Sequence, residues 1–441
     1  MVSITQSLIA LLAGITLIVL LTARFRVHAF FALLLAAILT GMLLGLTFAE
    51  ILTVIKSGFG NIMGALGLLI VLGTTLGLIL EHTGSTAVLA SYVLRQTGTQ
   101  RAAMAMSMIG YIVGMPIFCD SGFIVLSGLN KALARRSGVS MVIMASSLAT
   151  GLYAVHCMMP PHPGITAAAG TIHAEVGQVM LYGLLIAIPA AVAGYSWSLL
   201  MGRKLPPAVI EEEEALQETV QGPSVLMSVL PIAVPVLLIA LRSLAGMETA
   251  PPGMLLQLIN VAGMPEVAIS AGILLALAGG PSVRRNELPR LLREGAEKAA
   301  GILVIIGGGG AFGAILAKAG IGGHIAQYQS LAAMGLFLPF LVTALLKTAQ
   351  GSSTVAIITA ASILQPLLPA LGMDAGHGPL LCVLAMGAGS MMISHTNDAY
   401  FWVISKFSGL EIKDMLRVYS TGSAVMGITA ILFIYLLSFL L

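Results

Sequence analysis

Charge is scarce in this chain: charged residues make up only 9% of its 441 residues, against about 25% in an average soluble domain. Hydrophobic residues, in contrast, make up 58%. That balance excludes a soluble fold, because so few polar side chains cannot cover a core of this size. We therefore expect an all-α polytopic membrane protein whose solvent, over much of its surface, is the lipid bilayer.

Cysteine and basic clusters are also scarce. The three cysteines, Cys119, Cys157 and Cys382, all lie in apolar stretches, where they suit small buried hydrophobic residues better than disulfides or metal ligands. The formal net charge is only +3, and no basic patch is interleaved with aromatic residues, so the chain is not expected to bind nucleic acid. We expect no metal ion and no other cofactor.

Apolar runs long enough to cross a bilayer as helices, about 20 residues each, fall into two series. We expect the first series at 4–23, 27–48, 58–81, 140–171 and 178–201, and the second at 224–245, 264–280, 297–318, 379–407 and 418–441. Two pieces, 101–135 and 331–366, are expected to fold back as re-entrant hairpins. Between the series lies an acidic linker, 202–223, that carries Glu211–Glu214.

The basic residues predict the orientation, because the cytoplasmic loops of membrane proteins carry an excess of lysine and arginine. They fall on one side of the membrane if both termini face outside, and examples along the chain are Arg24, Arg101, Arg135, Arg203, Arg290 and Lys413. We therefore expect the linker to be cytoplasmic and the protein to lie in the inner membrane of a bacterial cell.

The two halves of the chain are related in sequence. The stretch GTTLGLILEHTG (73–84) matches GGAFGAILAKAG (309–320) at Gly73, Gly77, Ile79, Leu80 and Gly84. Each half has the same order of spans, hairpin, broken span and final span, and the two matching helices run in opposite directions in the expected topology. We predict two inverted repeats, 1–201 and 224–441, each with about five spans and a re-entrant hairpin, as in many secondary transporters.

Four polar stretches interrupt the apolar runs: GMPIFCDSGF (114–123), HCMMPPHPG (156–164), KTAQGSSTV (347–355) and SHTND (394–398). Prolines and glycines break helices, and irregular backbone at membrane depth is tolerated only where protein or a wet cavity surrounds it. We therefore expect broken helices that meet near the midplane and form a substrate site. The predicted substrate-binding residues are Asp120, Ser121, Gly122, His156, Lys347, Gln350, Gly351, Ser352, Ser353, Thr354, Ser394, His395 and Asn397.

Helix N-termini attract anions, so the breaks favour a small anionic substrate. Lys347 could neutralise its carboxylate, or could instead extend to the membrane interface. Asp120 could bind substrate, cap the helix that follows it, or do both. The histidines at the breaks, His156, His162 and His395, suit either a proton relay or a structural role.

Uptake of an anion into a negative cell opposes the membrane potential, so we expect protons to accompany the substrate. The proton carrier must lie at membrane depth, where burial disfavours the charged form of a carboxylate. Asp120 and Asp398 are the carboxylates at the predicted breaks. Asp120 is the preferred carrier because it follows a proline break directly, with His156 as the reserve candidate and Asp398 as the other carboxylate.

The four stretches, in this order, resemble the gluconate permease family of bacterial proton symporters. The residues that match the family pattern are Gly114, Pro116, Phe118, Asp120, Gly122, Phe123, His156, Pro160, Pro161, Pro163, Gly164, Ala349, Gln350, Gly351, Ser352, Thr354, Val355, Ala356, Ser394, His395, Asn397 and Asp398. The resemblance covers nearly the whole chain. It implies uptake of gluconate or a related sugar acid or hydroxy acid, an ion-transporter-type fold and a homodimer that works as an elevator. Lys347 stands where the pattern has arginine, a change that weakens two-pronged binding of a carboxylate.

Other functions are also compatible with parts of this pattern. A sodium-coupled carboxylate transporter or a D-serine-type amino-acid transporter is the alternative within the same class. An intramembrane metalloenzyme is a distant alternative, because no pair of metal ligands occurs at helical spacing. A channel is also distant, because an inverted repeat suits alternating access. We expect a transporter and not an enzyme.

Overall fold

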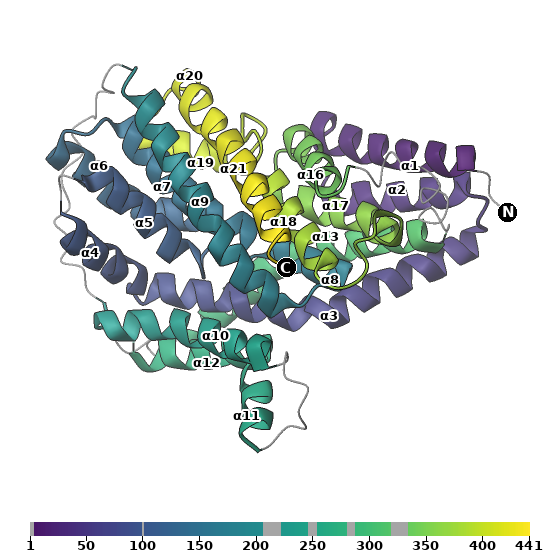
Figure 1. The fold of residues 1–441 in the computed structure, drawn as a ribbon, viewed down its shortest axis with the longest axis horizontal. Coiled ribbons are helices and arrows are strands. Elements are labelled where there is room, and N and C mark those ends of the chain that lie inside the picture. The colour runs from purple at the N-terminus through teal and green to yellow at the C-terminus, as the bar shows by residue number, and fades with distance from the viewer. Residues whose placement is uncertain (1–3, 99–100, 206–221, 246–253, 280–286, 319–333) are drawn as a thin grey trace.

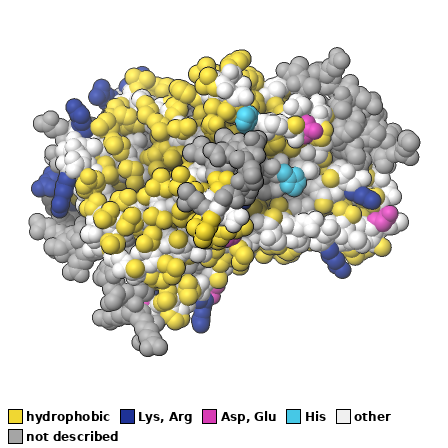
Figure 2. Space-filling model, turned by 60° about the horizontal axis from the view of Figure 1, so that its bottom comes forward, with side chains coloured by type: hydrophobic (Ala, Val, Ile, Leu, Met, Phe, Trp, Pro, Cys, Tyr) yellow, Lys and Arg dark blue, Asp and Glu magenta, His cyan; other side chains and the backbone are white. Residues whose placement is uncertain are grey.

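The computed structural model describes residues 4–98, 101–205, 222–245, 254–279, 287–318 and 334–441. Every regular element in these ranges is a helix (Figure 1). Six of the helices are long and apolar enough to cross a membrane, or seven if one bent pair counts as a single span. Hydrophobic side chains also cover much of the face drawn in Figure 2. The prediction of an all-α, multi-pass membrane protein is therefore confirmed.

The helices of the first half follow the apolar runs of the sequence. They are α1 (Ile4–Val19), α2 (Ala29–Leu43), α3 (Phe48–His82), α4 (Ser85–Thr97), α5 (Ala102–Gly114), α6 (Cys119–Ser137), α7 (Met141–Met158), α8 (Pro163–Ile172) and α9 (Val176–Gly202). A π-helical turn, Leu20–Arg24, continues α1. The cysteines Cys119, Cys157 and Cys382 are buried and free, as expected.

The second half follows with a similar set. Its α-helices are α10 (Val225–Ala245), α11 (Met254–Ala262), α12 (Pro265–Gly279), α13 (Leu288–Lys318), α16 (Phe337–Gln350), α17 (Ser353–Leu364), α18 (Gly378–Ser390), α19 (Ala399–Ser408), α20 (Ile412–Met415) and α21 (Thr421–Ser438). Short turns, η3 (Gln365–Leu367) and η4 (Pro369–Leu371), follow α17, and a π-helical turn, η5 (Leu416–Ser420), leads into α21. The bent pair is α11 and α12, at 71°.

Some helices differ in extent from the expected spans. α3 begins ten residues before position 58, because Thr47 and Glu50 form a capping box at its start. α13 likewise begins before position 297, at Leu288. α4 was not among the predicted spans, since 13 residues are too few to cross a bilayer. The broken spans expected at 140–171 and 379–407 are each two helices with a break between them.

The two longest described helices, α3 and α13, pack against each other (Figure 1). Their backbones are close enough that a Cβ on Gly58 would lie 2.5 Å from the carbonyl oxygen of Gly310. α2 packs on α13 while α12 packs on α3, so each long helix is covered by a helix from the other half. The final helices, α9 and α21, also pack together.

After its long helix, each half has a hairpin, a broken pair and a final helix. In the first half these are α5–α6, α7–α8 and α9, and in the second they are α16–α17, α18–α19 and α21. The inverted orientation of the halves and their boundaries stay predictions. The cytoplasmic linker also stays a prediction, because Glu211–Glu214 lie outside the described residues. Gly320 of the repeated stretch lies outside them as well.

Candidate functional site

Four helix breaks occur at the four polar stretches. The first break (115–118) separates α5 from α6, and the second (159–162) separates α7 from α8. The third (351–352) separates α16 from α17, and the fourth (391–398) separates α18 from α19. Local sequence explains each: prolines occupy the first two, Gly351 has a positive φ of 88° in the third, and Asp398 caps α19 at the end of the fourth.

The first and second breaks lie together. The ring of Phe118 makes edge contacts with the rings of His156 and His162, at centroid distances of 6.4 and 6.3 Å. The Nε2 atom of His162 hydrogen-bonds the carbonyl oxygen of Gly114 at 2.8 Å. Helix α3 approaches closely behind them, since a Cβ on Gly77 would lie 2.6 Å from a carbonyl oxygen of the first break. Only glycine allows that approach.

The third break touches both the second and the fourth. A Cβ on Gly164, at the start of α8, would lie 3.0 Å from the Cα of Thr354. A Cβ on Gly351 would lie 2.1 Å from the carbonyl oxygen of Asn397. The side-chain amide of Asn397 donates to the carbonyl of Thr348 at 2.8 Å, and Nε2 of His395 lies 3.1 Å from the same carbonyl.

A buried ion pair joins the third and fourth breaks. The ammonium group of Lys347 lies 2.6 Å from Oδ2 of Asp398, and the side chain of Lys347 is 0% exposed. The same ammonium group also donates to the carbonyl of Gly351, and the hydroxyl of Ser394 donates to Oδ2 of Asp398. The other carboxylate oxygen of Asp398 accepts from the backbone N–H of Tyr400 at 3.0 Å. Lys347 therefore does not extend to the membrane interface.

Aromatic side chains connect the fourth break to the first. The rings of Phe123 and Tyr400 meet edge to face at 6.2 Å, and the hydroxyl of Tyr400 donates to the carbonyl of Ala149 at 3.2 Å. Tyr153 stacks on Tyr400 at 5.7 Å and on His156 at 6.3 Å, with the Lys347 ammonium group 5.9 Å from its ring centroid. All four breaks therefore converge on one place.

Three polar side chains at this place have few or no hydrogen-bond partners among the described residues. His156 is buried, and its Nδ1 has no hydrogen-bond partner among the described residues. Both amide atoms of Gln350 are buried and likewise without a described partner. Asp120, half-buried in the first turn of α6, has one hydrogen-bond contact in the described chain, with the thiol of Cys119 at 3.9 Å. No side chain caps α6.

The other predicted site residues serve the backbone or lie nearby. Ser352 accepts a hydrogen bond from the backbone N–H of Val355 and so caps α17. Ser353 is buried, and Ser121 and Thr354 are half-buried. Gly122 packs against Leu152 of α7.

Sequence reasoning missed the aromatic members of the site, notably Tyr153 and Tyr400. Tyr153 lies three residues before His156 on one helix, so helical spacing alone could have placed the two side chains together. Tyr400 follows the fourth break directly. The substrate and proton roles of the predicted residues stay predictions.

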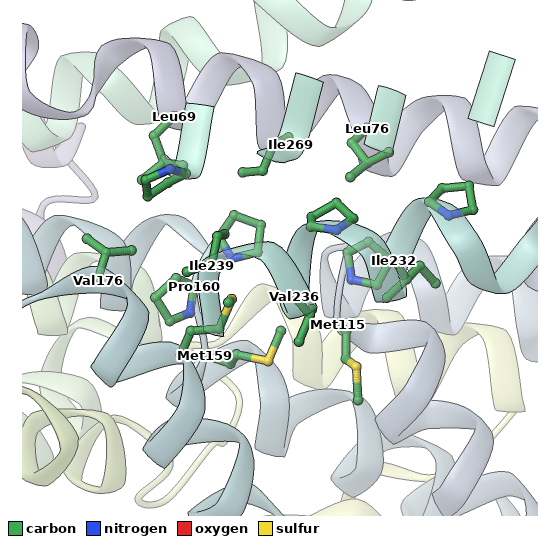
Figure 3. Close-up of a pocket in the computed structure, with 16 residues that line it drawn as sticks. Leu69, Leu76, Met115, Met159, Pro160, Val176, Ile232, Val236, Ile239 and Ile269 are labelled. Carbon is green, nitrogen blue, oxygen red and sulfur yellow. The ribbon is translucent and has the colours of Figure 1, made fainter. Parts of the chain in front are cut away.

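A separate apolar pocket lies behind the first two breaks (Figure 3). The breaks contribute Met115, Pro116, Met159, Pro160 and Pro161, and helices α3, α9, α10 and α12 supply most of the remaining wall. All of its lining side chains are apolar, and none of the predicted site residues is among them. This pocket does not suit an anion, so the polar convergence of the breaks is the candidate site.

Comparisons with known proteins agree with this arrangement. A sequence model of GntP family permeases matches residues 6–440. A gluconate permease of Pseudomonas aeruginosa is 34% identical over 98% of this chain and 97% of its own. An L-idonate transporter of Escherichia coli is 31% identical over 96% and 97%, and an E. coli D-serine transporter is 30% identical over 98% of both chains.

Among solved structures, an antimetabolite efflux pump of Neisseria gonorrhoeae has a similar fold. Its TM-score is 0.64 at 16% sequence identity, and the match covers 88% of this chain and 83% of the pump. At that identity the similarity concerns the fold alone. The overall helical arrangement is therefore similar to that of this efflux pump.

Proposed function

The chain belongs to the GntP permease family, and from this premise we propose that it takes up gluconate or a related hydroxy acid together with protons. Its relatives are named permeases and transporters, so the expectation of a transporter and not an enzyme is confirmed. The observation that carries the finer proposal is the meeting of four helix breaks around polar groups without partners. We place the protein, as the sequence predicts, in a bacterial inner membrane.

The third break offers the substrate both charge and hydrogen bonds. The N-terminus of α17, with Ser353 and Thr354 in its first turn, presents backbone N–H groups and a positive helix end to a carboxylate. Next to it, the amide of Gln350 supplies a donor and an acceptor that have no partner among the described residues. A buried polar group without a partner is costly, and hydroxyl groups of a substrate can satisfy both kinds of atom. The site thus suits a hydroxy acid.

The buried ion pair changes the role proposed for Lys347. Its ammonium group is already paired with Asp398, so it is not available as a free cation to bind the carboxylate of the substrate. We assign to Lys347 the task of holding the third and fourth breaks together beside the substrate. The carboxylate of the substrate then binds chiefly at helix N-termini. Position 347 therefore does not need the two-pronged carboxylate binding of an arginine, and a lysine is sufficient there.

The same pair distinguishes between the candidate proton carriers. Asp398 has a lysine, a serine and a backbone N–H as partners, so both of its carboxylate oxygens are engaged in the structure. Asp120 is half-buried, and its one hydrogen-bond contact among the described residues is a long contact to a thiol. A carrier must gain and lose its proton, so we assign proton transfer to Asp120, with His156 as the reserve. An inward anion works against about 2.3 kcal/mol per 100 mV, which coupled protons offset.

The mode of transport is also proposed. We infer alternating access by a homodimeric elevator, in which the four breaks move together relative to other helices, as the sequence resemblance implies. The reciprocal packing of α2 on α13 and α12 on α3 supports two related halves. An opposed orientation of those halves would place their hairpins on opposite sides of the membrane.

Uptake by purified protein in proteoliposomes tests the proposal. The panel is radiolabelled gluconate, L-idonate and D-serine, each with an imposed inward proton gradient, an inward sodium gradient or neither. We expect accumulation of a sugar acid above its external concentration with the proton gradient only, which a channel cannot produce. Accumulation that follows sodium and ignores protons, or transport of D-serine alone, would show the proposal to be wrong.

A further inference from the structure

Three polar side chains lie buried beyond the breaks, between α6, α7 and α19. They are Asn130, Ser146 and Ser408, which we call the buried polar cluster. Asn130 and Ser146 are 0% exposed and Ser408 is 8% exposed. Neither amide atom of Asn130, nor the hydroxyl of Ser146 or of Ser408, has a hydrogen-bond partner in the described part of the chain. The three helices pack against one another.

Helix geometry places Asn130 and Ser146 at nearly the same level. A short turn joins α6 to α7, so the two helices are antiparallel, and Gly122 lies against Leu152. From that contact, Asn130 lies eight residues along α6, about 12 Å, and Ser146 lies six residues back along α7, about 9 Å. Both positions are therefore displaced from the breaks in the same direction and by similar amounts.

Ser408 reaches the same level from the third helix. α6 and α19 both start at a break and pack together, so they run in the same direction. The rings of Phe123 and Tyr400 meet near the two starts. Asn130 lies seven residues beyond Phe123, about 10 Å along α6 and on nearly the same face, so it points toward α19 as Phe123 does. Ser408 lies eight residues beyond Tyr400, about 12 Å along α19 and about 80° further round the helix. Its side chain is 8% exposed, so Ser408 is buried at the same level as Asn130.

Two more unpartnered hydroxyls extend this series in both directions. Tyr419, whose ring lies 6.0 Å from that of Tyr400, has no described partner for its hydroxyl and lies at the site end. Ser140, just before α7, has a buried and unpartnered hydroxyl at the other end. There Arg101 and Arg203 line a single surface pocket with Ser140. The series thus runs from the breaks toward the face that the sequence predicts to be cytoplasmic.

We propose that the buried polar cluster holds a chain of bound water that connects Asp120 with that membrane face. Buried polar groups in folded proteins are nearly always hydrogen-bonded, and an internal water typically makes about three such bonds. Water at this level satisfies the amide and both hydroxyls at once. Because Asp120 begins α6 on the site side, the chain gives it a route for protons, and this role rests on the proton coupling proposed above.

The proposal is tested with two variants and a matched control. Asn130→Leu replaces the amide by an apolar group of similar size, and Ser146→Ala removes one hydroxyl with little change of volume. Ser198→Ala is the control, since Ser198 is equally buried but its hydroxyl donates to the carbonyl of Gly194 at 2.8 Å. If Asn130→Leu fails to fold, Ser146→Ala still decides the question.

The first readout is hydroxyl-radical footprinting, in which ionised internal water oxidises adjacent side chains. We expect Leu126 and Ile404, which lie one turn before Asn130 and Ser408, to be labelled in the wild type despite their burial, and to lose labelling in the two cluster variants but not in the control. The second readout is transport in proteoliposomes. Proton-driven accumulation should fall severalfold in the cluster variants, while exchange without a gradient stays close to the wild type.

Two outcomes would overturn the proposal. If Leu126 and Ile404 are unlabelled in the wild type, the cluster is dry. If Asn130→Leu and Ser146→Ala accumulate substrate as the wild type does, the water carries no protons. Uptake driven by sodium in the wild type would instead refute the proposed proton coupling and the proton role of the water chain. The labelling result would then still test whether the cluster holds water.

Discussion

The breaks of the first half and those of the second half are built alike but are stabilised differently. In the second half, Lys347, Asp398 and Ser394 satisfy one another, and Asn397 is bonded to the backbone of the facing break. In the first half, prolines and aromatic packing shape the breaks, and the one described hydrogen-bond contact of Asp120 is a long contact to a thiol. The second half thus provides a fixed frame, and the first half holds the carboxylate to which we assign proton transfer.

The difference follows from where opposite charges occur. The polar stretches of the second half contain both a lysine and an aspartate, so the cost of burying each charge is offset by the other. The polar stretches of the first half contain an aspartate and two histidines but no lysine or arginine. A lone carboxylate at membrane depth is expensive to keep unless it has a function. Removing a partner should therefore damage stability in the second half and transport in the first.

Lys347→Met should give the largest effect, a loss of about 3–5 kcal/mol of stability, because it leaves Asp398 buried and unpaired. Thermal unfolding of the detergent-solubilised protein measures it. The double variant Lys347→Met/Asp398→Asn should recover much of the loss, since it removes both charges. Equal destabilisation by the single and double variants would mean that the ion pair does not hold the frame together.

Gly351→Ala should rank second. Its new Cβ would lie 2.1 Å from the carbonyl oxygen of Asn397, and its φ of 88° disfavours any side chain, so the third and fourth breaks must separate. We expect a loss of about 1–3 kcal/mol or more in thermal unfolding. Gly372→Ala is the control, with a φ of 66° and nothing near its Cβ. A similar loss in both variants would attribute the effect to backbone conformation alone.

Gln350→Leu probes the unpartnered amide in the frame itself. The leucine leaves a substrate hydroxyl without a hydrogen-bond partner. The apparent KM should therefore rise about tenfold, which is the cost of one unpaired polar group. The melting temperature should stay the same or rise. Ser352→Ala and Asn397→Ala should also raise KM, together with some loss of stability. Unchanged KM values in all three, from the concentration dependence of uptake, would remove the third and fourth breaks from the substrate site.

Replacing the two histidines of the second polar stretch should give the smallest changes in stability, and the two variants should differ in whether they affect stability or uptake. His162 is bonded to the carbonyl of Gly114, so His162→Ala should cost about 1 kcal/mol in unfolding. His156 has an Nδ1 atom without a described partner, so His156→Ala should lower uptake while reducing the stability less than His162→Ala does. The reverse pattern, with His156 as the more stabilising residue, would contradict the contrast between paired and unpaired groups.

Local features of the sequence were enough to predict the breaks. Pro116, the prolines at 160–163 and Gly351 act on their own backbone, so their effects can be read without knowledge of packing. The pairing of Lys347 with Asp398 could not be read in this way, because 51 residues separate them and helix packing decides which charges meet. The buried polar cluster could not be predicted from the sequence for a similar reason. An asparagine such as Asn130 is usually exposed on a helix, and its burial here results from packing with α7 and α19.

We assign the proton to Asp120 and a structural role in the frame to Asp398. The most direct test compares wild type and Asp120→Asn in the same proteoliposomes, first with an imposed inward proton gradient and then in exchange without any gradient. We expect Asp120→Asn to lose gradient-driven accumulation of the sugar acid, to keep exchange and to melt at a temperature close to that of the wild type. Accumulation by Asp120→Asn on the proton gradient, at a level near that of the wild type, would contradict this assignment.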